Sequence, residues 1–130
     1  MASSPAFTAT PNVGIQTIEA GDTTTVLDVF TAGASGSRID QIFAVHDDTT
    51  AVIVKLYVYD GAEAHYLGMI SMGVASAPVP FITGDFLQLA AWGGSDACLI
   101  LPAGYKLQAG VSATLTAGKK CAIYAAGGDF

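Results

Sequence analysis

The stretch Ala51–Tyr59, AVIVKLYVY, decides the fold class. Its residues are mostly β-branched or aromatic, and they alternate as in a strand whose sheet has one aliphatic face. That aliphatic face consists of Val52, Val54, Leu56 and Val58. The second face consists of Ile53, Lys55, Tyr57 and Tyr59, so it is largely apolar as well. Because a strand with two apolar faces usually contacts protein on both, this pattern indicates an assembly protein more than an enzyme.

Similar strand patterns recur at spacings of about ten residues, and no convincing amphipathic helix interrupts them. We expect strands at 13–20, 23–30, 38–46, 51–59, 66–72, 86–92, 98–101, 105–111 and 119–125. This spacing is typical of a β-sandwich or a barrel. The long connection at 73–80, with Pro78 and Pro80, favours an all-β, jelly-roll-like β-sandwich of about eight strands. Strands 38–46 and 51–59 are expected to pair as a hairpin through Asp47–Thr50.

The chain of 130 residues fits one domain. Residues 1–12 are small, polar and interrupted by Pro5 and Pro11, which predicts an extended N-terminal arm. Residues 13–130 are predicted to form a single β-sandwich domain.

The chain is poor in charge and rich in apolar residues. Charged residues make up 12%, against roughly 25% in an average soluble domain, while hydrophobic residues make up 52%. The longest charge-free run, Ala64–Gly84, contains prolines and glycines and is no continuous apolar span, so membrane insertion is not expected. The N-terminus carries no secretory signal, and we expect synthesis in the cytoplasm. A surface partly covered by protein partners therefore explains the composition best.

The net charge of −6 argues against nucleic acid as a partner, because phosphate binding needs clustered Lys or Arg. Cys98 and Cys121 lie in apolar, strand-like contexts that favour two buried thiols over a disulfide, although a bridge between adjacent strands stays open.

No residue pattern predicts catalysis, a metal or a cofactor. His46 and His65 each have acidic neighbours in sequence, but no metal-ligand spacing connects them, and they are interpreted as solvated histidines at strand ends. The acidic pairs near Asp47 and Asp60 fit turns better than a calcium loop. A nucleophile next to a base is also missing, so an enzyme is not expected.

Aromatic side chains leave a sugar-binding alternative open. Tyr57 and Tyr59 share a face, and Trp92 is a further candidate for stacking. The competing interpretation is that these rings pack against a neighbouring subunit.

Three segments resemble small virion proteins of tailed bacteriophages. They are SGSRIDQIFAVHDDTTAVIVKLYVYDG, ILPAGYKLQAG and the ending AGGDF, within residues 35–61 and 100–130. The resemblance implies a structural role on the particle, as a head decoration (cement) protein or a module of the tail or its fibres. It also implies partners, namely the major capsid protein and further copies of the chain in a trimer. It brings no functional residues with it.

The sequence therefore predicts a decoration protein that stabilises the virion head by non-covalent contacts, with a tail-fibre receptor- or glycan-binding module as the alternative. A cupin-type enzyme is a third reading, which the two separated histidines count against. Candidate interface residues come from the second face of 51–59 and from the arm, because interface centres favour tyrosine and disfavour charge. They are Pro5, Phe7, Pro11, Ile53, Tyr57 and Tyr59.

Overall fold

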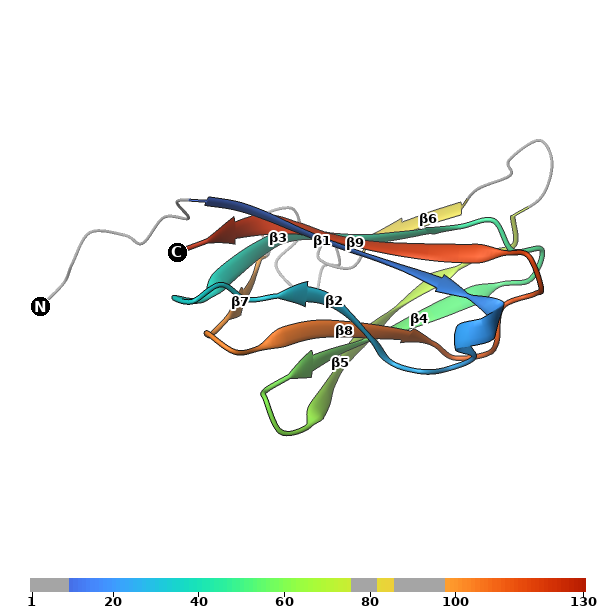
Figure 1. Cartoon of the computed structure of the whole chain (residues 1–130). Helices are drawn as coiled ribbons and strands as arrows, with labels where there is room; N and C mark the ends of the chain where they lie inside the picture. Colours follow the sequence, from blue (N-terminus) through green and yellow to red (C-terminus); the bar gives the residue numbers. More distant parts are fainter. Residues whose placement is uncertain (1–9, 76–81, 86–97) are drawn as a thin grey trace, which may run out of the picture.

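A computed structural model of the chain describes residues 10–75, 82–85 and 98–130. These residues form two antiparallel sheets that pack face to face (Figure 1). The elements are β1 (Thr10–Glu19), a 3-10 helix η1 (Ala20–Asp22), β2 (Leu27–Thr31), β3 (Ser37–His46), β4 (Val52–Tyr59), β5 (Ala64–Met72), β6 (Ile82–Asp85), β7 (Leu99–Leu101), β8 (Lys106–Val111) and β9 (Lys120–Asp129).

The strand order is that of a jelly roll. Sheet A has the order β1-β9-β3-β6, with the short β7 also paired to β3, and sheet B has the order β2-β8-β4-β5. Neighbours within a sheet are therefore mostly distant in sequence, as in two interleaved Greek keys. The predicted all-β, jelly-roll-like sandwich is confirmed.

The core lies between the sheets and follows the predicted alternation. In β4, Val52, Val54 and Leu56 are buried, whereas Ile53 is half-buried and Lys55 is exposed. The largest fully buried apolar side chains come from both sheets: Ile18, Phe30, Ile39, Ile42, Val54, Leu56, Leu101, Leu107 and Ile123.

The predicted hairpin between 38–46 and 51–59 is wrong. β3 lies in sheet A and pairs with β6, β7 and β9, whereas β4 lies in sheet B and pairs with β5 and β8. The segment between them crosses from one sheet to the other. Alternation does not distinguish the two arrangements, because both strands point their aliphatic side chains into the same core. The hairpin of sheet B joins β4 to β5 instead, through a turn in which the Asp60 carboxylate accepts the N–H groups of Ala62 and Glu63.

Several element boundaries differ from the prediction. β1 already begins at Thr10, so Thr10–Asn12 lie in sheet A rather than in the arm. β2 begins at Leu27 because η1 and the turn after it precede it, and β9 extends to Asp129. The predicted strand at 86–92 lies outside the described residues.

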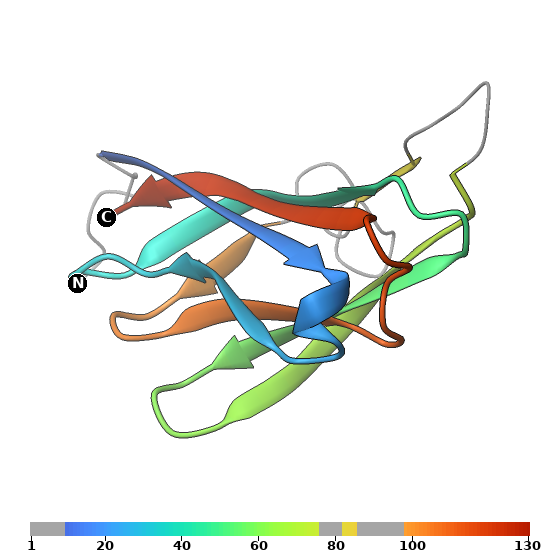
Figure 2. The ribbon, with the colours of Figure 1, turned by 45° about the vertical axis from the view of Figure 1, so that its right-hand side comes forward.

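One side of the sandwich is closed by contacts between β1 and β2 (Figure 2). The side-chain amides of Asn12 and Gln16 donate hydrogen bonds to the backbone carbonyls of Thr31 and Asp28, at 3.1 and 2.9 Å. Gly14 lies between them, where a Cβ would overlap the carbonyl oxygen of Val29. The two edge strands thus cover each other, which protects their free backbone groups.

Candidate interaction surfaces

The second face of β4 lies on the outside of sheet B, as the sequence predicts. Ile53, Tyr57 and Tyr59 are half-buried there, and two exposed side chains of β5 adjoin them: Tyr66 is 59% exposed and Met69 is 50% exposed. Tyr57 and Tyr66 meet edge to face, with ring centroids 5.7 Å apart. We call Ile53, Tyr57, Tyr59, Tyr66 and Met69 the tyrosine face.

Polar contacts lie beside the tyrosine face, on β2 and β8. The Asp28 carboxylate accepts hydrogen bonds from Gln108 (2.7 Å) and from Lys106 (3.1 Å). These two hydrogen bonds hold the pKa of Asp28 below its usual value. The tyrosine face is therefore an aromatic patch that also holds the exposed Lys55, with a polar border on the side of β8 and β2, as at the rim of a protein interface.

A second apolar surface lies on the outside of sheet A. Val13 and Ile15 of β1 are 60% and 57% exposed. Ile15 lies opposite Tyr124 of the neighbouring strand β9. On the other side of β9, Tyr124 stacks on Phe43 of β3 with ring centroids 4.8 Å apart. We call the uncharged outward residues in the middle of these three strands the sheet A face; they are Val13, Ile15, Thr17, Gln41, Phe43, Val45, Ala122, Tyr124 and Ala126. Sequence reasoning missed this face, because the alternation of β1 and β9 does not tell which strands will be neighbours.

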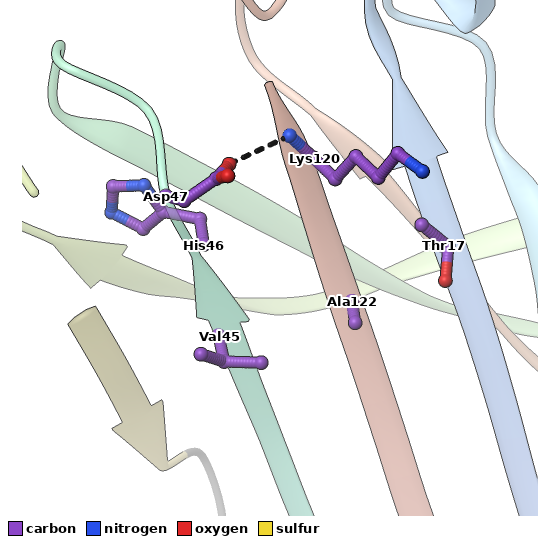
Figure 3. Close-up of a pocket in the computed structure, with 6 residues that line it drawn as sticks. All are labelled: Thr17, Val45, His46, Asp47, Lys120 and Ala122. Atoms are coloured by element: carbon purple, nitrogen blue, oxygen red, sulfur yellow. Dashed lines mark hydrogen bonds between the residues drawn. The ribbon is translucent and has the colours of Figure 1, made fainter. Parts of the chain in front are cut away.

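A hollow of about 240 Å³ lies at one end of the sheet A face. It is lined by outward residues of three neighbouring strands, Thr17, Val45 and Ala122, and by His46, Asp47 and Lys120 (Figure 3). The Lys120 backbone N–H donates to Asp47 at 2.9 Å, and the Lys120 ammonium lies 3.3 Å from Glu19. The volume is below the range of about 300–1,000 Å³ typical of small-molecule sites.

His46 is buried rather than solvated, which corrects the prediction. It occupies an inward position at the end of β3, where its Nε2–H donates to the Gly73 carbonyl at 2.8 Å and its Nδ1 accepts the Asp48 N–H at 3.0 Å. Both ring nitrogens are thus occupied by the backbone, and the ring serves to position the segment that crosses between the sheets.

Asp48 is a buried carboxylate next to His46. Thr116 donates to it through its N–H (2.8 Å) and its hydroxyl (2.7 Å), and Thr50 does the same at 3.0 and 3.1 Å. Burial raises the pKa of Asp48, but the hydrogen bonds from Thr116 and Thr50 outweigh it and lower that pKa to about 2. The carboxylate therefore holds the loop before β9 against the crossing segment.

His65 is exposed near the start of β5, as predicted for a solvated histidine at a strand end. Its Nε2 lies 2.9 Å from the Asp60 carboxylate, and that hydrogen bond raises the pKa of His65. Within residues 10–75, 82–85 and 98–130, no three His, Cys, Asp or Glu side chains gather closely enough to hold a metal ion. The same residues include no helix long and apolar enough to cross a membrane.

The two cysteines are not joined. Cys121 is buried in the core, and burial raises the pKa of its thiol to about 12. Cys98 is exposed, which corrects the prediction of two buried thiols. The reason is its position before the three-residue strand β7, outside the alternation that points side chains into the core.

Of the three candidate interface residues in the predicted arm, only Pro11 lies within the described residues. Pro11 lies in β1 opposite Gly128 and is exposed, in a strand with one free edge where proline is tolerated. Pro5, Phe7 and the sugar-stacking candidate Trp92 lie outside the described residues.

No family model matches the chain, and neither does any curated protein. Among solved structures, the fold is similar to a chain of the acidic stable capsid structure of the Helicobacter pylori bacteriophage KHP30. The TM-score is 0.59 at 10% sequence identity, and the match covers 93% of this chain and 89% of the other. At that identity the likeness establishes a shared fold over nearly the whole length of both chains.

Proposed function

We propose that this chain is a structural protein of a bacteriophage virion, and specifically a decoration (cement) protein of the head. It would stabilise the shell by non-covalent contacts with the major capsid protein and with its own copies. Neither nucleic acid nor a membrane is a partner in this proposal, and no catalytic step belongs to it.

The observation that carries the proposal is that both outer faces of the sandwich expose apolar side chains. Tyr66 and Met69 lie on the outside of sheet B, and Val13 and Ile15 lie on the outside of sheet A. Exposed apolar patches mark interaction sites, and two of them on opposite sheets suit a protein held between neighbours. The shared fold with a chain of a phage capsid structure supports the choice of particle.

We assign the contact with the shell to the tyrosine face. Tyrosines bury a large area with few rotatable bonds, and their hydroxyl groups still find polar partners at an interface. On the β5 side Tyr57 and Tyr59 lie opposite Tyr66 and Ala64, and on the β8 side they lie opposite Gln108 and Lys106. They are thus aromatic anchors next to a polar border.

Binding of the purified protein to heads of its own phage tests the proposal. Replacing Tyr57 and Tyr59 together by alanine is expected to weaken head binding by at least about tenfold, since each is placed as an interface anchor. Ile100→Ala is the matched control, because Ile100 is 60% exposed but lies on β7 of the other sheet. Equal occupancy of heads by all three proteins, measured by density-gradient centrifugation, would disprove the assignment.

The contact of the exposed Tyr66 with the half-buried Tyr57 also favours a second candidate, a glycan-binding module of the tail or its fibres. Adjacent aromatic rings at a surface can stack on the apolar face of a sugar. A glycan array would then show selective binding that Tyr66→Ala abolishes, and gold-labelled antibody would decorate tails rather than heads in electron micrographs.

A further inference from the structure

Across β1, β9 and β3, the middle of the outer side of sheet A carries no charged side chain. Between the ion pair Glu19–Lys120 at one end and Arg38–Asp40 at the other, its outward positions on β1, β9 and β3 are apolar or neutral. Its most exposed residues, Val13 and Ile15, lie on β1, which begins directly after residues 1–9. The face therefore lies close to the point where the N-terminal segment leaves the sandwich.

The area of the face is too small for a stable dimer that packs face to face. Three strands at about 4.8 Å spacing and roughly seven residues at about 3.3 Å rise cover on the order of 300 Å². A standard interface buries about 800 Å² on each partner. An extended segment that each copy places on the next copy adds one such contact for every subunit. The total area buried in the assembly then increases although the face itself stays small.

The N-terminal segment has the chemistry and length of such an occupant. Residues 1–9, MASSPAFTA, contain no charged side chain, and Phe7 is their one aromatic residue. Nine extended residues span at most about 30 Å, which is comparable to the length of a ten-residue strand such as β1.

The sequence around Thr10 favours a neighbouring copy over the parent molecule. Residues 6–11, AFTATP, contain none of the Gly, Asn or Asp residues that reverse a chain tightly. Thr10 precedes Pro11, and a residue before proline is held in extended geometry. A segment that continued in the line of β1 would lead away from its own sheet A face and toward a neighbouring copy.

We propose that residues 1–9 of one copy bind to the sheet A face of a second copy. Phe7 is the anchor, placed in the hollow over Thr17, Val45 and Ala122, whose size suits one large side chain. Because the segment and the face are different surfaces, the contact is heterologous and closes into a ring when the rotation permits. The trimer that the resemblance to virion proteins implies would be such a ring. The purpose of this contact rests on the proposed function, because a ring of copies would serve to bind the shell. The contact itself forms between copies of the chain and requires no capsid.

Photo-crosslinking tests the contact in the full-length protein. Phe7 is replaced by p-benzoylphenylalanine, and this protein in its natural isotopes is mixed with ¹⁵N-labelled wild-type protein before illumination. We expect crosslinks from the unlabelled N-terminal peptide to the labelled peptide 121–130, which contains Ala122 and Tyr124. The same photoreactive residue at Tyr66, on the outside of sheet B, is the control and is expected to leave peptide 121–130 unlabelled.

Light scattering behind size exclusion supplies the second measurement. Deleting residues 2–9, or replacing Ile15 by lysine, is expected to raise the concentration needed for self-association by at least about tenfold. Ile15 is more than half exposed, so Ile15→Lys is expected to leave the melting temperature unchanged. Met69→Lys, at a half-exposed position on the outside of sheet B, is its matched control.

Three results would overturn the proposal. The first is a wild-type protein that stays monomeric in light scattering at all concentrations, and the second is a set of crosslinks confined to unlabelled peptides. The third is self-association that survives deletion of residues 2–9 but is lost in Ile15→Lys, which would indicate that two sheet A faces pack against each other instead. The test is independent of head binding, because a ring that forms but does not bind heads would refute the proposed function and leave this contact intact.

Discussion

Asp48 is the residue whose chemistry most constrains the fold. A buried carboxylate is costly unless its oxygens are hydrogen-bonded, and here Thr50 and Thr116 supply four hydrogen bonds to it. Thr116 lies 68 residues away in sequence. The carboxylate therefore connects the segment that follows β3 to the loop that precedes β9.

Asp48→Asn should destabilise the protein by about 2–4 kcal/mol. In either orientation of the new amide, its NH₂ group meets a backbone N–H, of Thr116 or of Thr50, so one hydrogen bond becomes a contact between two donors. Urea unfolding measures the loss. Asp47→Asn is the control, because Asp47 accepts its hydrogen bond at an exposed site, and a loss as large as that of Asp48→Asn would contradict the argument.

The same carboxylate predicts an acid transition. The pKa of Asp48 is lowered to about 2 in the folded state, against about 3.9 in an unfolded chain. A lowered pKa stabilises the fold above the unfolded value, so this stabilisation is complete above about pH 4–5 and is lost as the pH falls toward 2. We expect the free energy of unfolding of the wild type to decrease more steeply than that of Asp48→Asn over this range. Parallel pH profiles from chemical denaturation would refute it.

The burial of Asp48 and of His46 shows what the sequence alone could not predict. Asp48 and His46 flank a turn, and local chemistry correctly assigned Asp47–Thr50 to a connection. Their burial depends on Thr116 and on the Gly73 carbonyl, which the fold brings near from distant positions. No local pattern contains that information.

Among the elements, the contact between β1 and β2 leaves no room for a side chain at Gly14. A Cβ on Gly14 would lie against the β2 backbone, 2.9 Å from Cα of Phe30 and closer still to the Val29 carbonyl oxygen. Gly14→Ala must therefore separate the strands or distort one of them. We expect a loss of about 2–4 kcal/mol in urea unfolding.

Gly21 provides the matched control for Gly14. It lies in η1, directly after β1, and a Cβ there would meet no atom within 4 Å. Gly21→Ala should therefore change stability by less than about 1 kcal/mol. Equal stability of the two variants would show that β1 and β2 do not approach each other as closely as described.

At this scale the sequence predicted strands well and pairings poorly. Alternation in Ala51–Tyr59 located β4 and its inward residues, because burial on one face leaves a period of two. It could not distinguish a hairpin partner from a strand of the opposite sheet, since both would point the same residues inward. For the same reason the tyrosine face, which lies mostly on one strand, was predictable, whereas the sheet A face, which combines strands from both ends of the chain, was not.

At the scale of the whole molecule, the two sheets lie face to face (Figure 1), so their outer faces, which carry the two apolar surfaces, lie on opposite sides of the core. The proposals assign them different partners, the shell to the tyrosine face and a second copy's N-terminal segment to the sheet A face. A ring of copies would then present several tyrosine faces at once. Contacts that are individually weak become strong when they are linked, because each later contact forms within the same complex.

This linkage predicts how deletion of residues 2–9 affects head binding. The deletion leaves every tyrosine face intact, yet it should weaken binding to heads by on the order of 100-fold, because separate monomers lose the gain from linkage. Replacing Tyr57 and Tyr59 by alanine should weaken binding through the direct contact while leaving the ring intact. Titration of heads with each protein measures both effects. If the deleted protein bound heads as tightly as the wild type, the copies would be joined by the shell and not by their own N-terminal segments.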